Sequence, residues 1–141
     1  MIGDGAGNIG WGDVATIGLQ TRKTASVTQS IASGAAANVS ISTAKGFVLY
    51  SIETSHAAWV TLYTSTTART ADAGRLETTD PTPGSGVLSE VITTGAVTQL
   101  ITPGTICFNS SPTATTYAKV VNKSGSTANV TVTLTYVQIE N

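Results

Sequence analysis

The C-terminal segment, residues 129–139, alternates apolar and hydroxyl side chains with a period of two residues. The apolar positions are Val130, Val132, Leu134 and Tyr136, and the hydroxyl positions between them are Thr131, Thr133 and Thr135. Successive side chains of an extended strand point to opposite faces, so this pattern predicts a β-strand with one face on a core and the other in water. Shorter segments of the same kind recur along the chain, and no reactive side chain interrupts them. The sequence therefore predicts an all-β protein whose function depends on its surface.

The low charge of the chain limits what that surface can be. At 141 residues it has the length of one domain and can bury a core without metal or disulfide support. Charged residues are only 11% of it, against roughly 25% in an average soluble domain, and serine and threonine take their place. Such an exterior suits packing against other subunits, because few charges would have to be desolvated.

Several classes of partner are not expected. The net charge of −1 gives no basic surface for nucleic acid, and no apolar run approaches the roughly 18 residues of a membrane-spanning helix. The first residues do not resemble a secretory signal. A lone cysteine, Cys107, excludes a disulfide within the chain and a cysteine-based zinc cluster. We therefore expect synthesis in a reducing cytoplasm, with neither nucleic acid nor membrane as partner.

The first 23 residues differ from the rest of the chain. They are rich in glycine, which opposes a helix and weakens a strand. They also contain apolar residues that need a surface to lie on, namely Ile9, Trp11, Val14, Ile17 and Leu19. We interpret residues 1–23 as an extended docking arm that contacts this domain or a neighbouring subunit, and residues 24–141 as the folded domain. A disordered leader is the alternative, although such leaders rarely carry tryptophan with this much isoleucine and valine.

The remaining chain contains about nine strand-like segments separated by turn residues. They are residues 27–31, 38–43, 46–54, 58–65, 87–93, 97–101, 105–109, 116–122 and 128–139. No segment shows a helical period, apart from a single helical turn that 68–76 could contain. Two packed antiparallel sheets would cover the inner faces, so the expected fold is a β-sandwich of jelly-roll or immunoglobulin-like type.

The long irregular stretch 66–86 is a candidate contact loop. It carries Arg69, Asp72 and Arg75 and ends in a segment rich in proline and glycine. Loops of this length are either functional or mobile connections. The alternative interpretation is a solvated connection held by a few pairs between arginine and carboxylate side chains.

No motif supports catalysis, a cofactor or a metal. Residues 5–10 match G-x-G-x-x-G, but too few residues precede them for the strand that a dinucleotide site requires. His56, the single histidine, lies between two predicted strands, and the chain has no G-x-S-x-G nucleophile elbow. The carboxylates of Asp72, Glu77 and Asp80 lack the spacing of a calcium loop. We expect no enzyme activity, no cofactor and no metal site.

Three stretches resemble small virion structural proteins of tailed bacteriophages, particularly those of cyanobacterial phages. They are AWVTLYTSTTARTAD at residues 58–72, the tail from VVNKSG at residues 120–125 to VTVTL at residues 130–134, and the leader NIGWGD at residues 8–13. The resemblance implies a β-sandwich subunit on a phage particle, made in the host cytoplasm and located in the virion. It implies other virion proteins, major capsid or tail proteins, as partners, and a homo-oligomer, either a dimer or a trimer. It supplies no functional residue.

Two functions follow as hypotheses. The first is a non-enzymatic protein that decorates or cements the capsid by burying its arm and the edges of its sandwich against neighbouring subunits. Its contact residues would be the five apolar arm residues together with Arg69, Asp72 and Arg75. The alternative is a carbohydrate- or receptor-binding module of a tail fibre or baseplate. That alternative requires Trp59, Tyr63 or Tyr117 to face solvent.

Overall fold

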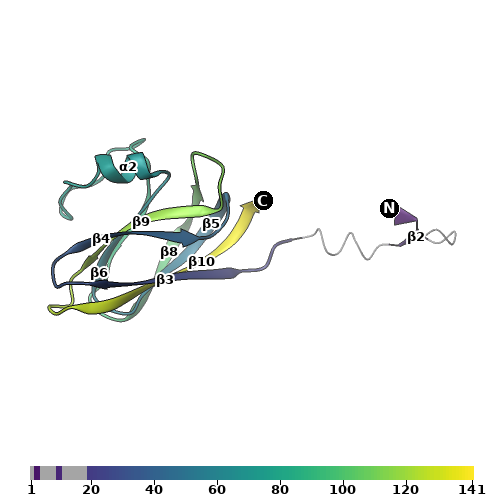
Figure 1. Cartoon of the computed structure of the whole chain (residues 1–141). Coiled ribbons are helices and arrows are strands. Elements are labelled where there is room, and N and C mark those ends of the chain that lie inside the picture. Colours follow the sequence, from purple (N-terminus) through teal and green to yellow (C-terminus); the bar gives the residue numbers. More distant parts are fainter. Residues whose placement is uncertain (1, 4–8, 11–18) are drawn as a thin grey trace.

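The computed structural model describes residues 2–3, 9–10 and 19–141, and these residues are mostly β-strand (Figure 1). The strands are β1 (Ile2–Gly3), β2 (Ile9–Gly10), β3 (Lys23–Ile31), β4 (Ala36–Ser42), β5 (Gly46–Thr54), β6 (Ala58–Tyr63), β7 (Val87–Ile92), β8 (Val97–Phe108), β9 (Thr115–Asn122) and β10 (Ala128–Glu140). The helix in the described residues is α2 (Thr66–Ala71). The expected all-β class is confirmed.

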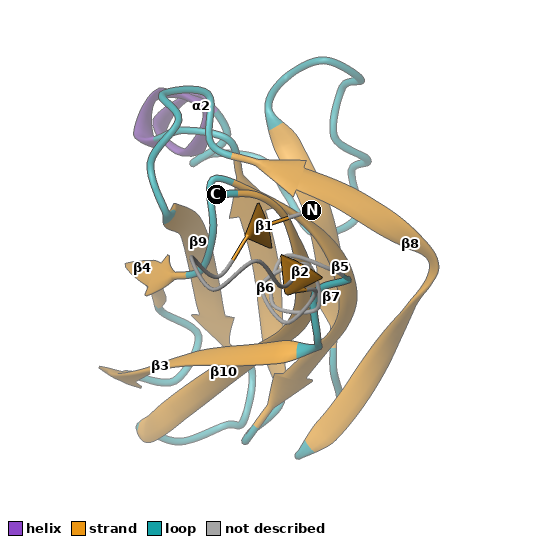
Figure 2. Ribbon diagram, turned by 90° about the vertical axis from the view of Figure 1, so that its right-hand side faces the viewer, coloured by secondary structure: helices purple, strands orange, loops and turns teal. Residues whose placement is uncertain are grey.

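Strands β3 to β10 form two four-stranded antiparallel sheets, and β1 pairs separately with β2. The first sheet has the order β3-β10-β5-β8 and the second has the order β4-β9-β6-β7 (Figures 1 and 2). Consecutive strands alternate between the sheets until β6 and β7, which are neighbours in the second sheet. The two sheets enclose one core, as expected for a β-sandwich.

The sandwich contains eight strands because two predicted segments belong to one strand. The sequence predicts separate strands at residues 97–101 and 105–109, because Pro103 and Gly104 between them are typical of turns. In the structure β8 runs through both, with a register shift against β5 between Leu49 and Ser51, and it bends midway (Figure 2). β8 is an edge strand, where a proline without an N–H group is tolerated. The prediction of about nine strands was therefore wrong by one.

The alternation in the C-terminal segment is confirmed by the packing of β10. Its apolar residues Val130, Val132, Leu134 and Tyr136 are buried, whereas the threonines between them are half-buried. β10 pairs with β3 on one side and β5 on the other, so it is an inner strand of its sheet. The Tyr136 ring packs against Phe47 of β5, with ring centres 5.0 Å apart. This face of β10 is therefore a major part of the core.

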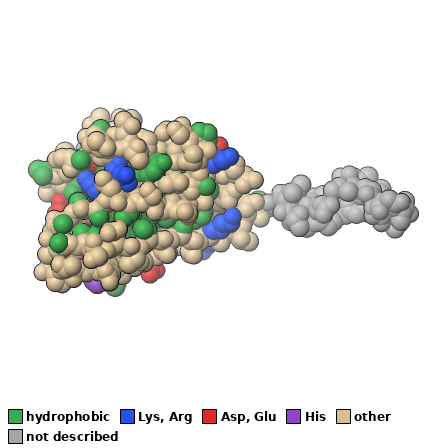
Figure 3. All heavy atoms as spheres, in the orientation of Figure 1, with side chains coloured by type: hydrophobic (Ala, Val, Ile, Leu, Met, Phe, Trp, Pro, Cys, Tyr) green, Lys and Arg blue, Asp and Glu red, His purple; other side chains and the backbone are tan. Residues whose placement is uncertain are grey.

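Hydroxyl side chains dominate the exterior. On the outer side of the first sheet, the hydroxyls of Thr28 and Thr131 lie 2.7 Å apart, on residues that are directly paired between β3 and β10. Figure 3 shows a surface made largely of uncharged polar side chains and backbone, with few charged groups. Hydrogen-bonded threonine pairs of this kind stabilise neighbouring strands without introducing charge.

The predicted long connection 66–86 begins with the short helix α2. Ser65 caps this helix, because its Oγ accepts the Ala68 backbone N–H at 3.0 Å. The connection closes at Gly86, where φ is +93° and an added Cβ would lie 2.6 Å from the Cβ of Ala68. Only glycine fits this close approach. The helix begins earlier than the suggested turn in 68–76, and no helix in the described residues is long and apolar enough to cross a membrane.

Candidate functional site

The connection 66–86 lies on the outer face of the second sheet (Figure 1). Strand pairing aligns three polar residues of that face in one row, since Thr61 of β6 is opposite Lys119 of β9 and Glu90 of β7. The Thr61 hydroxyl donates to Glu90 Oε2 at 3.1 Å. All six residues of β6 are buried, because the core covers one side of this strand and the connection covers the other.

Arg75 is the centre of a charged cluster beneath the connection. Its Nε lies 2.8 Å from Asp72 Oδ1 and its Nη2 lies 3.0 Å from Asp72 Oδ2, a bidentate pair. Nη2 also binds Glu90, and Nη1 donates to the Thr79 carbonyl at 2.8 Å. The side chains of Arg75, Asp72 and Glu90 are only 8%, 11% and 20% exposed. A single guanidinium therefore holds both the connection and β7.

Two aromatic residues of β6 complete the cluster. The Tyr63 hydroxyl donates to Asp72 Oδ2 at 2.7 Å. The Trp59 ring has the Arg75 guanidinium 5.4 Å and the Lys119 ammonium 4.5 Å from its centre. The Lys119 ammonium also donates to the Asp72 carbonyl at 3.3 Å. Cations over an indole ring are attracted by its negative face, so Trp59 helps to hold both side chains in place.

The cluster shifts the pKa values of its members. Burial alone would raise the pKa of Asp72, but hydrogen bonds from Arg75 and Tyr63 outweigh it and lower that pKa. For Glu90 burial is likewise outweighed, chiefly by the hydrogen bond from Arg75, so its pKa is also lowered. Burial and the adjacent Asp72 carboxylate raise the pKa of Tyr63, whereas burial lowers the pKa of Lys119. Both carboxylates are therefore ionised and engaged near neutral pH.

Arg69 forms a second contact between α2 and the second sheet. Its Nη1 donates to the carbonyls of Val39 at 2.9 Å and Ala118 at 3.3 Å. The guanidinium lies 5.5 Å from the centre of the Tyr117 ring. The arginines expected in a contact loop thus point toward the sheet of their own chain.

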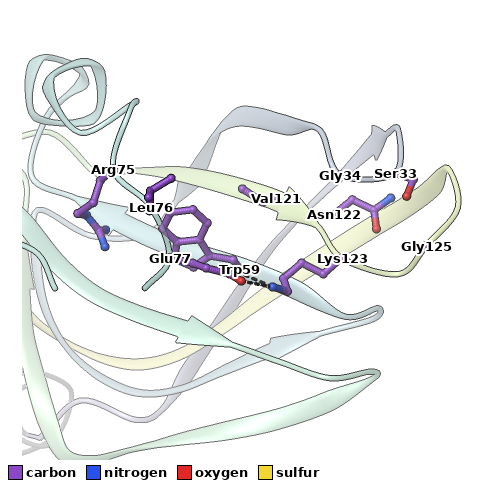
Figure 4. Close-up of a pocket in the computed structure, with 10 residues that line it drawn as sticks. All are labelled: Ser33, Gly34, Trp59, Arg75, Leu76, Glu77, Val121, Asn122, Lys123 and Gly125. Atoms are coloured by element: carbon purple, nitrogen blue, oxygen red, sulfur yellow. Dashed lines mark hydrogen bonds and ion pairs between the residues drawn. The ribbon is translucent and has the colours of Figure 1, made fainter. Parts of the chain in front are cut away.

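A groove of about 510 Å³ lies beside this cluster (Figure 4). Trp59, Leu76 and Val121 form its apolar wall. At its mouth the Lys123 ammonium binds both carboxylate oxygens of Glu77, at 2.6 and 2.5 Å. The charged residues that line the described groove, Arg75, Glu77 and Lys123, each have an ionic partner within the chain.

The structure brings Arg69, Asp72 and Arg75 together over the second sheet, as described above. Among the arm residues, Leu19 is fully exposed, and Ile9 pairs with Gly3 through its backbone. The other three predicted arm contacts, Trp11, Val14 and Ile17, lie outside the described residues. The contacts of the arm and of the loop with a partner stay predictions. The division at residue 23 also stays a prediction, although β3 begins there, at Lys23.

Reactive side chains in the described residues have ordinary structural partners. His56 Nδ1 lies 2.8 Å from Ser55 Oγ, which also accepts the Thr131 backbone N–H at 2.8 Å, so this pair ties a turn to β10. Burial raises the pKa of the Cys107 thiol to about 12, which keeps it protonated. Within residues 2–3, 9–10 and 19–141, no three histidine, cysteine, aspartate or glutamate side chains are grouped to hold a metal ion.

The outer face of the first sheet carries apolar side chains that the described residues leave largely uncovered, although the Arg22 guanidinium lies over the Tyr50 ring. We call them the open face; they are Val48 and Tyr50 of β5 with Leu100, Ile106 and Phe108 of β8. All are exposed except Val48, which is half-buried. Ile106 is 64% exposed and lies directly opposite Val48 in the strand register. The two outer faces therefore differ, since one is covered by the connection and the other presents apolar groups.

Sequence reasoning missed Glu90, Lys119 and the open face. A lysine between the buried residues Ala118 and Val120 was a signal, because charged groups are seldom buried without partners. However, Glu90 and Trp59 can be recognised as neighbours of Lys119 only when the pairing of the strands is known. The open face was hidden because its residues come from strands that are distant in sequence.

No protein-family model matches the chain, and no curated protein and no solved structure shows a significant similarity to it.

Proposed function

We propose that this chain is a non-enzymatic structural protein of a bacteriophage particle, which decorates or cements the capsid by burying surface against neighbouring virion proteins. The open face is the observation that carries this proposal. Exposed apolar groups gathered on one rigid face are typical of protein interaction sites. In the described residues, ionic and hydroxyl groups are instead satisfied within the chain or spread over the exterior.

The strand order supports the same role. Taking β3 to β10 as strands one to eight, the sheets have the orders 1-8-3-6 and 2-7-4-5. We assign this order to a jelly roll rather than to an immunoglobulin-like sandwich, in which the sheets contain four and three strands in the constant type. Jelly rolls form viral capsid and lectin domains among others, so this support is by analogy of fold.

The N-terminal segment would supply a second contact. Residues 19–22, just before β3, are exposed. An extended arm adds interface area with few residues, at the entropic cost of ordering it. Trp11 is the strongest candidate anchor because aromatic side chains dominate interface energetics.

Removal of residues 1–22 tests the arm, since β3 begins at Lys23. The truncated chain and the full chain are mixed with capsids that lack this protein, and attachment is measured by cosedimentation. We expect the truncated chain to unfold at an unchanged temperature but to lose attachment. Trp11→Ala should weaken attachment, while His56→Ala serves as the matched control in a turn of the sandwich. Equal attachment of the truncated and full chains would show that the arm is not the anchor.

The carbohydrate-binding alternative has less support. It needs exposed aromatic platforms, whereas Trp59 is 6% and Tyr63 is 1% exposed, and Tyr117 lies under Arg69. A glycan array with the full chain tests it directly. Binding that Trp59→Ala removes without unfolding the chain would favour this alternative over the structural role.

A further inference from the structure

We propose that the open face is the interface of a twofold-symmetric dimer, in which the first sheet of one copy packs face to face on the first sheet of a second copy. This inference rests on the proposed function, because it identifies one of the surfaces that a subunit of an assembly would bury. The occupant is a second copy of this chain, and Ile106 and Leu100 lie at the centre of the interface.

The first argument comes from the two outer faces of the sandwich. The second sheet also carries aromatic side chains on its outer face, Trp59 and Tyr63, and the connection 66–86 buries them. The first sheet has no such cover among the described residues, and Leu100, Ile106 and Phe108 remain exposed. Apolar side chains on a sheet face are stabilised by packing against another layer. A second copy would provide such a layer with the same apolar side chains.

Charge favours a copy of the same chain as the occupant. Residues 97–108, which form the whole of β8, contain no charged side chain. No charge of β8 would therefore have to be desolvated when this face is buried. In a twofold interface each patch meets itself, and an uncharged patch does so without repulsion. The charges nearest to β8 on this face have both signs and have partners, since the Arg22 guanidinium lies over the Tyr50 ring, 5.0 Å from its centre, and Glu53 accepts a hydrogen bond from Thr98.

The whole outer face of the first sheet, which includes the open face on β5 and β8, is large enough for a stable dimer. Strands lie about 4.8 Å apart and rise about 3.3 Å per residue, so four strands of nine residues cover roughly 600 Å². Two such faces would bury on the order of 1,200 Å² in total, which is the lower end of specific interfaces. The threonine and serine side chains on the β3 and β10 half of the face would form the polar margin.

Sedimentation velocity and equilibrium of the full chain test this inference. We expect a reversible species of twice the 14.3 kDa chain mass. Ile106→Lys and Leu100→Lys should each raise the dissociation constant about tenfold or more, because a buried lysine would have no partner at the interface. Leu76→Lys is the matched control, since Leu76 is similarly exposed, at 67%, but lines the groove over the other sheet. A species of three copies, or a dimer that only Leu76→Lys dissociates, would overturn the proposal.

A second measurement uses the unmodified chain and does not depend on whether a variant folds. Oxidative footprinting compares the modification of Tyr50 in dilute and concentrated solution. We expect protection of Tyr50 on concentration, with Tyr117, which lies over the second sheet, unchanged as an internal reference. A monomer at all concentrations would overturn the dimer but leave attachment to capsids intact. Conversely, if the truncated chain loses only its attachment to capsids and still dimerises, the dimer proposal stands.

Discussion

The Tyr63 hydroxyl donates a hydrogen bond of 2.7 Å to the Asp72 carboxylate, and this contact links an inner strand of the second sheet to the connection that covers it. Tyr63 is the last residue of β6, and Asp72 follows the last residue of α2. The chain therefore folds back onto its own sheet directly after the short helix α2. The cluster around this contact holds the connection against the sheet. Its contribution can therefore be measured as a change in the free energy of unfolding.

Arg75→Ala should destabilise the protein by about 2–4 kcal/mol, because it leaves two carboxylates that are mostly buried without their counter-charge. Urea denaturation monitored by tryptophan fluorescence measures this free energy of unfolding. Lys123→Ala removes a more exposed ion pair, with Glu77, and should cost less than about 1 kcal/mol. Similar losses in the two variants would show that Arg75 is not the centre of the cluster.

Stability should fall as the solution is acidified. The folded-state pKa values of Asp72 and Glu90 are lowered, so the unfolded chain binds protons at these groups at a higher pH than the folded chain does. Their contribution is therefore present above the ordinary carboxyl pKa values near 4 and is lost as the pH falls through the lowered values.

In the Arg75→Ala variant, burial would raise the pKa values of these two carboxyls without the opposing effect of the guanidinium. The same acidification should therefore lower the free energy of unfolding by less. Denaturation curves between about pH 6 and pH 2 in both proteins provide the test. A parallel pH dependence of the two free energies would mean that Arg75 does not set the pKa values of Asp72 and Glu90.

Leu134→Ala should cost about 3 kcal/mol, since Leu134 is fully buried in the core and the truncation leaves a cavity. Thr133→Ala, one residue earlier and on the other face of β10, should cost less than about 1 kcal/mol. Thermal unfolding of both variants measures the difference. If the two changes had equal effects, the faces of β10 would not be assigned correctly.

Asn122→Ala should destabilise the chain by about 2–3 kcal/mol, although it changes a single polar side chain. The Asn122 amide is fully buried and donates to the carbonyls of Ile31 at 2.7 Å and Ser126 at 2.8 Å. Its Oδ1 also accepts the Ser124 N–H at 2.8 Å, so the substitution leaves backbone groups of two turns without partners. Asn129→Ala, at an exposed position, is the control and should change stability by less than about 0.5 kcal/mol. Chemical denaturation of the two variants measures the difference between their free energies of unfolding.

Local patterns were sufficient to predict most of the strands. The alternation in β10 and the apolar run of β5 identified two inner strands, and β5 has the bounds expected for it, residues 46–54. These predictions succeed because the period of side-chain orientation is a property of the extended backbone itself. β8 was divided wrongly at Pro103 and Gly104, since the turn preference of these residues is overridden at the edge of a sheet.

Sequence alone therefore determined the class of fold, the buried face of β10 and the low charge of the exterior. Only the tertiary structure decided which strands are neighbours, and with them the cluster of Arg75, Asp72 and Glu90 and the open face around Ile106. The physical reason is that burial of an apolar face fixes the orientation of a strand, whereas pairing of strands depends on contacts between distant parts of the chain. Lys119 illustrates the difference, because its place in an apolar strand is evident in the sequence while its neighbours Trp59 and Asp72 are not.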